Sequence, residues 1–160
     1  MTDLTPTPTR ALRRIYQMIT RVNPAEVLNG PFEEAPSGAV GAEIAQELRQ
    51  AIRRVEAEGI DLSTGHVDYA KIADSAAFAE YQHAARRLHH LDLTTLGDEA
   101  DQRAFWINLY NALIVHAMIA FGVKNRALEV SGVFERAAYS VGGFRFSADD
   151  IEHGILRGNA

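Results

Sequence analysis

The spacing of apolar residues along the chain predicts a mainly helical protein. Apolar residues recur every three or four positions in three segments, from about Thr9 to Val22, Ala42 to Glu58 and Asp74 to His90. This period is that of an amphipathic helix with one face turned to a core. A fourth segment, from about Asp98 to Phe121, is apolar on nearly every face. We therefore expect it to form the buried central helix of a bundle.

One stretch near the carboxyl end predicts a β-hairpin. In "YSVGGFRF" (139–146), the pair Gly142-Gly143 suits a two-residue turn between two short strands. Such a turn sets Val141 opposite Phe144 and Tyr139 opposite Phe146, on a face that a helix must cover. The predicted fold class is therefore mainly α (α+β), a helical bundle around a buried central helix with one small β-hairpin.

The chain divides into two parts by composition. Residues 23–41 are rich in proline and glycine, which is typical of a loop or linker. We therefore expect residues 1–41 to form an N-terminal helix and linker, and residues 42–160 to form one helical domain. The basic outer face of the first helix is read as a solvated surface, with an anionic partner as the alternative.

Composition narrows the classes of function. A net charge of −5 over 160 residues argues against nucleic-acid binding, which needs a clustered basic surface. The absence of cysteine excludes a disulfide, a thiolate zinc site and a cysteine nucleophile within these residues. No secretory signal is visible, so a cytoplasmic location is expected. The apolar run 104–121 contains Asn108, Asn111 and His116, which favours a buried helix over a membrane span.

Two asparagines stand out in "FWINLYNAL" (105–113). Asn108 and Asn111 are three residues apart and therefore share one face of the central helix. Burying an amide without partners costs about 1–3 kcal/mol, so the pair is expected to need hydrogen-bonding neighbours. One interpretation is a buried polar latch that fixes loops against the helix, and the other is an amide that binds substrate or orients a catalytic histidine.

His153 is the candidate for chemistry. It follows Asp149 by four residues and Asp150 by three, so a carboxylate can reach it on a helix surface. A histidine with an acidic partner is half of a nucleophile–base–orienter arrangement. The alternative is an ordinary surface histidine, since neither Ser140 nor Ser147 lies in a nucleophile motif.

Two further charged residues lie on the same predicted helix. Glu152 and Arg157 could bind substrate there, or they could form surface ion pairs of little energetic value.

No metal or cofactor is predicted. His83 and His90 are seven residues apart, too far to chelate one ion, and the sequence lacks dense metal-ligand motifs and Gly-rich phosphate loops. His116, inside the apolar run, is expected to be a hydrogen-bonded core histidine.

Three blocks of sequence together resemble one family. They are "VDYAKIADSAAFAEY" (67–81), "AFWINLYNALIVHAMI" (104–119) and "FSADDIEHGILR" (146–157). The pattern is similar to that of the bacterial and plant proteins grouped as domain of unknown function 547, over roughly residues 66–157. The resemblance implies no settled activity. It also implies a second half beyond the Ile-Leu-Arg motif, with an Asn-Cys and a later Cys-Pro, so this chain is expected to be either a truncated domain or a naturally short member.

Two hypotheses for function follow. In the first, the domain is a structural or protein-interaction module, which forms a homo-oligomer or pairs with the missing second half. In the second, it is the incomplete half of a hydrolase or acyl transferase that uses His153 with a cysteine nucleophile beyond residue 160.

Overall fold

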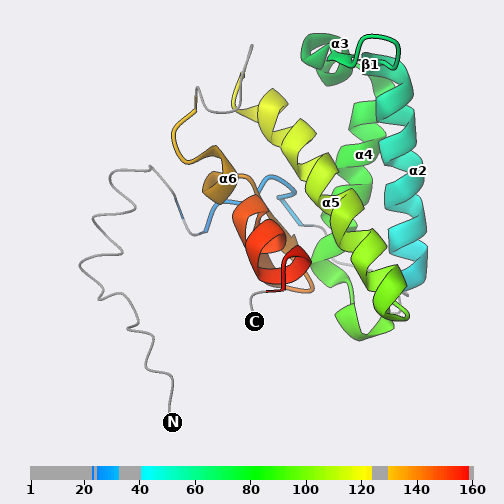
Figure 1. Ribbon diagram of the computed structural model, residues 1–160, viewed down its shortest axis with the longest axis vertical. Coiled ribbons are helices and arrows are strands. Elements are labelled where there is room, and N and C mark those ends of the chain that lie inside the picture. Colours follow the sequence, from blue (N-terminus) through cyan, green and yellow to red (C-terminus); the bar gives the residue numbers. More distant parts are fainter. Residues whose placement is uncertain (1–22, 24, 33–40, 124–129, 159–160) are drawn as a thin grey trace.

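The computed structural model describes residues 23, 25–32, 41–123 and 130–158 (Figure 1). The predicted helix from Thr9 to Val22 lies outside the described residues. In chain order the elements are α2 (Gly41–Gly59), β1 (Ile60–Asp61), β2 (His66–Val67), α3 (Tyr69–Ala73), α4 (Ala76–Arg87), η1 (Leu88–His90), η2 (Leu93–Thr95), α5 (Glu99–Ala120), α6 (Val133–Arg136), β3 (Ala138–Val141), β4 (Phe144–Ser147) and η4 (Asp150–Leu156). The predicted class, mainly α with a small β-hairpin, is confirmed, and the described residues contain a second short hairpin as well.

Helices α2 and α4 lie side by side and form the most extensive helix pair (Figure 1). The buried side chains are Ile44, Leu48, Ala51 and Val55 on α2, and Phe78, Tyr81, Ala84 and Ala85 on α4. They follow the helical spacing seen in the sequence, although Ile52, expected in the α2 stripe, is only partly buried and Ala51 is buried instead. Burying a leucine, isoleucine or valine side chain stabilises the fold by about 1.5–3 kcal/mol. Ser75 caps α4, since its Oγ accepts a hydrogen bond from the backbone N–H of Phe78 at 3.1 Å.

Gly59 is the last residue of α2, but it does not adopt the left-handed conformation of the usual glycine cap. Freedom at φ is therefore not what places glycine here. A Cβ at this position would lie 2.0 Å from Cγ1 of Ile72 in α3. Glycine therefore allows α3 to approach the end of α2 closely.

Helix α5 begins and ends where the sequence predicts. Asp98 caps its first turn, accepting from the backbone N–H of Asp101 at 2.9 Å, and Gly122 follows its end with a φ of 65°. Its buried side contacts α4 through a ring contact between His116 and Phe78, whose centroids are 5.3 Å apart. Its other side is exposed at Ile107, which is 42% accessible. The helix is thus a wall of the bundle as well as part of its core.

The hairpin β3–β4 has the predicted register. Val141 pairs with Phe144 and Tyr139 pairs with Phe146, around glycines 142 and 143 with positive φ. Tyr139 and Val141 are fully buried, whereas Phe144, the first residue after the turn, is 67% exposed. The expected cover of this face therefore does not extend to Phe144.

A second hairpin, β1–β2, is not predicted by the sequence pattern. Ile60 pairs with Val67 and Asp61 pairs with His66. Strands of two residues are too short to show the alternation that identifies a strand.

Residues 25–32, expected to form part of a linker, lie against the β3–β4 hairpin. The backbone N–H of Leu28 donates to the carbonyl of Ala138 at 2.8 Å, and Nε of Arg145 donates to the carbonyl of Glu26 at 3.0 Å. This segment therefore belongs to the packed structure. The division of the chain at residue 41 stays a prediction.

Candidate functional site

The predicted pairing of His153 with an acid is present. His153 Nε2 lies 3.6 Å from Oδ1 of Asp149, and both side chains are about half exposed, at 47% and 49%. Within the described residues, no hydroxyl group contacts the imidazole. The pair provides a base with an acidic partner, but the structure does not bring a nucleophile to it.

Asp150, the other acid near His153, has a different role. Its Oδ2 accepts from the backbone N–H of Ser147 at 2.9 Å and from the Ser147 hydroxyl at 2.7 Å. The Ser147 hydroxyl oxygen in turn accepts from the backbone N–H of Asp150 at 3.0 Å. This reciprocal arrangement is a capping box with aspartate in the place of the usual glutamate.

Glu152 connects η4 to the central helix. Its Oε2 accepts from the hydroxyl of Tyr110 at 2.9 Å, and its Oε1 accepts from Nη2 of Arg157 at 2.6 Å. Burial, and then the hydrogen bond and charge of Glu152, raise the pKa of the Tyr110 hydroxyl to about 12. Both carboxylate oxygens are thus occupied by this chain. The hydrogen bond from Tyr110 holds η4 on α5, while the ion pair of Glu152 and Arg157 lies at the end of η4 itself.

Asn108 and Asn111 do not form the buried latch that the sequence favours. Asn108 is half-buried, Asn111 is exposed, and neither side chain makes a hydrogen bond with any described residue. The buried-latch interpretation is therefore wrong for these two residues. Their face of α5 is open because α2 contacts α5 over only a small area.

A buried amide latch does exist, but Asn29 provides it. Asn29 is 2% exposed. Its Nδ2 donates to the carbonyls of Ala85 and Ser140, and its Oδ1 accepts from the backbone N–H of Ser140, all at 2.9 Å. The amide joins residues 25–32, the end of α4 and strand β3. Asn29 gives no signal in the sequence because it lies in a proline- and glycine-rich segment without periodicity.

The open face of α5 lines two clefts along the seam between α2 and α5. We call them the apolar cleft and the polar cleft. The two asparagines belong to a row of α5 residues spaced three and four apart. The first half of this row, Asp101, Ala104 and Asn108, lines the polar cleft, and the second half, Asn111, Val115 and Met118, lines the apolar cleft. The stripe that makes this helix unusual in sequence therefore faces a seam in the structure.

The apolar cleft, of about 360 Å³, is the larger of the two. Its walls are the carboxyl-terminal halves of α2 and α5, and its floor includes rings of α4. Most of its lining is aliphatic or aromatic: Ile52, Val55, Ile60, Ile72, Phe78, Tyr81, Tyr110, Ala112, Ile114, Val115, Met118 and Phe134, with Glu56 and Asn111 as polar members. A cleft of this volume and character suits an apolar group.

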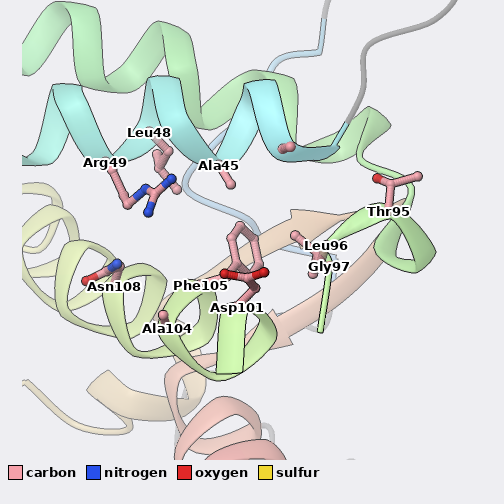
Figure 2. Close-up of a pocket in the computed structure, with 11 residues that line it drawn as sticks. Ala45, Leu48, Arg49, Thr95, Leu96, Gly97, Asp101, Ala104, Phe105 and Asn108 are labelled. Carbon is pink, nitrogen blue, oxygen red and sulfur yellow. The ribbon is translucent and has the colours of Figure 1, made fainter. Parts of the chain in front are cut away.

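The polar cleft, of about 170 Å³, lies at the amino-terminal halves of the same helices (Figure 2). Arg49 extends from α2 toward Asn108 on α5, while Asp101 lies further along the cleft beside the Phe105 ring (Figure 2). The Thr95 hydroxyl, also in the lining, accepts from the backbone N–H of Gly41 at 2.9 Å and so is already engaged by this chain.

The buried polar groups of the core lie behind the apolar cleft. His116 Nδ1 is 2.7 Å from the Tyr139 hydroxyl, which is also hydrogen-bonded to the Tyr81 hydroxyl. Burial lowers the pKa of His116 to about 4, so the ring is neutral at pH 7. The expectation of a hydrogen-bonded core histidine is confirmed. Among the described residues, no group of three or more potential metal ligands comes together.

One serine–histidine contact escaped sequence analysis. His89 Nδ1 lies 2.7 Å from Oγ of Ser140, and the His89 ring stacks on Phe32 with 3.9 Å between centroids. Burial, followed by the charge of His90, lowers the pKa of His89. Ser140 is buried in strand β3, so this pair ties η1 to the hairpin. Two residues 51 positions apart leave no local signal in the sequence.

Within the part of the chain that the structure describes, no helix has both the length and the apolar character needed to cross a bilayer. Comparison of the sequence with curated proteins gives no match, and neither does comparison with solved structures. Two of the three sequence blocks that resemble one family, residues 104–119 and 146–157, lie inside the region that matches a family model, and the block at residues 67–81 lies outside it. Residues 93–160 match the model of the family described as a protein of unknown function, DUF547, and this confirms the resemblance over that part of the chain.

Proposed function

We propose that this domain is a structural and protein-interaction module that binds an amphipathic helix in the seam between α2 and α5. The observation that carries the proposal is the apolar cleft, where Val115, Met118 and Ile52 line an opening between α2 and α5. Helix α2 packs along α4, and α5 contacts α4 through the His116 ring. Helices with an apolar face commonly bind in grooves of this kind, anchored by side chains three and four residues apart.

The shape of the seam fits a helix better than an extended chain. Its two walls are helices of 19 and 22 residues, and both clefts lie along their length. A third helix laid between two others can place its side chains in the grooves of both. Sheet edges, which would recruit an extended strand, are short in the described residues, because their strands have two or four residues.

The experiment uses helical peptides as the probe. A phage-displayed library of 19-residue peptides, with leucine fixed at positions three and four apart, is selected against the full chain. The affinity of the best peptide is then measured by fluorescence anisotropy. Val115→Glu, inside the apolar cleft, is expected to weaken binding by about tenfold or more, since it places a charge in an apolar contact.

Ile107→Glu is the matched control, because Ile107 is an exposed apolar residue of α5 outside both clefts. It should leave the affinity unchanged. Asn111→Glu, on the exposed rim of the apolar cleft, is a second test variant that is not expected to perturb folding. Equal affinities for all three variants, or a library that yields no saturable binder, would exclude the proposal.

The alternative function, half of a hydrolase or acyl transferase that uses His153, has narrower support. It rests on the contact between His153 and Asp149. The exposure of both side chains equally suits a surface ion pair, which contributes little to stability.

A further inference from the structure

We propose that the polar cleft binds a zwitterion whose carboxylate and ammonium groups are separated by a short apolar spacer. Arg49 and Asn108 bind the carboxylate, Asp101 binds the ammonium group, and Leu48 with Phe105 contacts the spacer. This inference concerns a different cleft from the one that carries the interaction proposal and does not depend on it.

Three of the four polar side chains that line this cleft have no partners among the described residues, and Thr95 is the exception. Arg49, Asp101 and Asn108 make no side-chain hydrogen bond or ion pair there. Two other arginines at the contact between α2 and α4 are paired with acids, since Arg54 contacts Glu80 and Arg87 contacts Glu47. The donors and the carboxylate in the polar cleft are therefore available to a ligand.

The polar groups are arranged with opposite charges at opposite ends. Figure 2 shows Arg49 and Asn108 near each other at one end, with Asp101 further along the cleft. Asp101 and Asn108 are seven residues apart on α5, about 10 Å along the helix axis at 1.5 Å per residue. The cleft thus has a cationic end and an anionic end.

Each end has a definite chemical preference. A guanidinium presents two parallel N–H groups to a carboxylate, and a nearby carboxamide adds another N–H donor. An aspartate carboxylate accepts hydrogen bonds from an ammonium group. A ligand with a carboxylate alone would leave Asp101 unpaired, and one with an amine alone would leave Arg49 unpaired. A zwitterion satisfies both.

The middle of the cleft is apolar. Leu48 and Phe105 are both buried, and Ala45 and Ala104 complete the walls without polar atoms. The two charged ends of the cleft are about two helical turns apart, and a spacer of roughly five methylene groups between the carboxylate and the ammonium group of a ligand suits this separation. The chemical class is therefore an ω-amino carboxylate. This class includes a free amino acid of that kind, and also a lysine at the carboxyl terminus of a peptide, which presents the same pair of groups.

The test is an NMR titration of the full ¹⁵N-labelled chain with 6-aminohexanoate. Hexanoate and hexylamine are matched probes, because each carries one of the two charges on a similar spacer. 6-Aminohexanoate is expected to shift the Asn108 side-chain amide and the Arg49 Nε signals saturably. Each single-charge probe should bind about tenfold more weakly, as expected when one charged hydrogen bond is lost.

Two variants assign the ends of the cleft. Arg49→Met should lower the affinity for 6-aminohexanoate to that for hexylamine, and Asp101→Asn should lower it to that for hexanoate. Arg53→Met is the matched control, since Arg53 is an exposed arginine of α2 outside the cleft. Both test positions are exposed, and thermal unfolding of each variant checks that it folds.

The source of the ligand is resolved by a peptide that ends in lysine, compared with the same peptide amidated at its carboxyl terminus. Binding of only the free-carboxyl peptide at or above the affinity of 6-aminohexanoate assigns a chain terminus. Tighter binding of 6-aminohexanoate assigns a free small molecule. Both results support the proposal. Absence of saturable shifts, equal affinity for all three small probes, or insensitivity to both variants overturns it.

Discussion

The Nδ1 atom of His116 and the hydroxyl of Tyr139 are 2.7 Å apart in the core, where they join α5 to strand β3. Tyr139 has no exposed surface and also contacts the hydroxyl of Tyr81 in α4. Three elements distant in sequence are therefore connected by one buried chain of polar groups. Such a chain stabilises the fold only while each member keeps its partner.

The first prediction concerns pH. Burial lowers the pKa of folded His116 to about 4 from its ordinary value of 6.5. Between these values the unfolded chain binds a proton that the folded chain does not, so the free energy of unfolding falls as pH falls. The slope from this residue approaches roughly 1 kcal/mol per pH unit below pH 6.5 and levels off below pH 4.

Urea unfolding at pH 7, 6 and 5 measures this effect, with His116→Gln as the comparison. Glutamine keeps a hydrogen-bonding group but does not titrate, so its pH dependence should be flatter than that of the original chain. Identical slopes for the two proteins would show that His116 is not the buried neutral group described.

The second prediction separates the two tyrosines. Tyr139→Phe removes the hydroxyl in the middle of the chain and leaves both His116 and Tyr81 without that partner. Tyr81→Phe removes only a terminal hydroxyl, so the contact between Tyr139 and His116 remains. We expect Tyr139→Phe to cost about 1–3 kcal/mol and Tyr81→Phe to cost less.

A double-mutant cycle on these tyrosines, followed by urea unfolding, checks the relationship. The cost of the double variant should be smaller than the sum of the single costs, because both changes remove the same hydroxyl contact. Strict additivity would contradict the shared hydrogen bond.

The third prediction compares three asparagines. Asn29→Ala removes three buried hydrogen bonds and should lower the free energy of unfolding by about 2–4 kcal/mol. Asn108→Ala and Asn111→Ala remove no hydrogen bond to a described residue, so each should change stability by less than about 0.5 kcal/mol. Thermal and urea unfolding of the three variants test the ranking. A larger loss for Asn108 than for Asn29 would restore the buried-latch interpretation.

The asparagines also show how far the sequence could predict this structure. Helix boundaries were predictable because their signals are local. Asp98 and Ser75 cap helices through residues three positions away, and Gly142-Gly143 determines a turn within its own hairpin. The latch of Asn29 joins residues 111 positions apart, and no periodic pattern encodes such a contact.

The candidate site was predictable only in part. The row that contains Asn108 and Asn111 was recognisable as an unusual helix face, but one helix does not reveal whether that face is covered. Its environment depends on the distance of α2 from α5, which results from the packing of both helices on other elements. The pair of His153 and Asp149 was predictable because helical spacing brings such residues together.

The fourth prediction concerns self-association, which an exposed apolar cleft favours. If a second copy of the chain is an occupant of the seam, the weight-average mass from light scattering will rise with protein concentration. Val115→Glu should suppress the rise, whereas Ile107→Glu should not, because only Val115 lines the cleft. A monomeric mass at high concentration for the original chain would exclude a second copy as the occupant.

The last prediction tests the close approach of α2 and α3 at Gly59. A Cβ there would lie 2.0 Å from Cγ1 and 2.5 Å from Cδ1 of the fully buried Ile72, so one of the two elements must move. We expect Gly59→Ala to destabilise the protein by about 1–3 kcal/mol, as overpacking does. Gly154→Ala is the control, since a Cβ at that position meets no atom within 4 Å and should be neutral or slightly stabilising. Because Gly59→Ala and Ile72→Ala act on the same contact, their combined cost by urea unfolding should be less than the sum of the separate costs. Additive costs would mean that the strain at Gly59 is relieved elsewhere, and that α3 does not depend on glycine for its position.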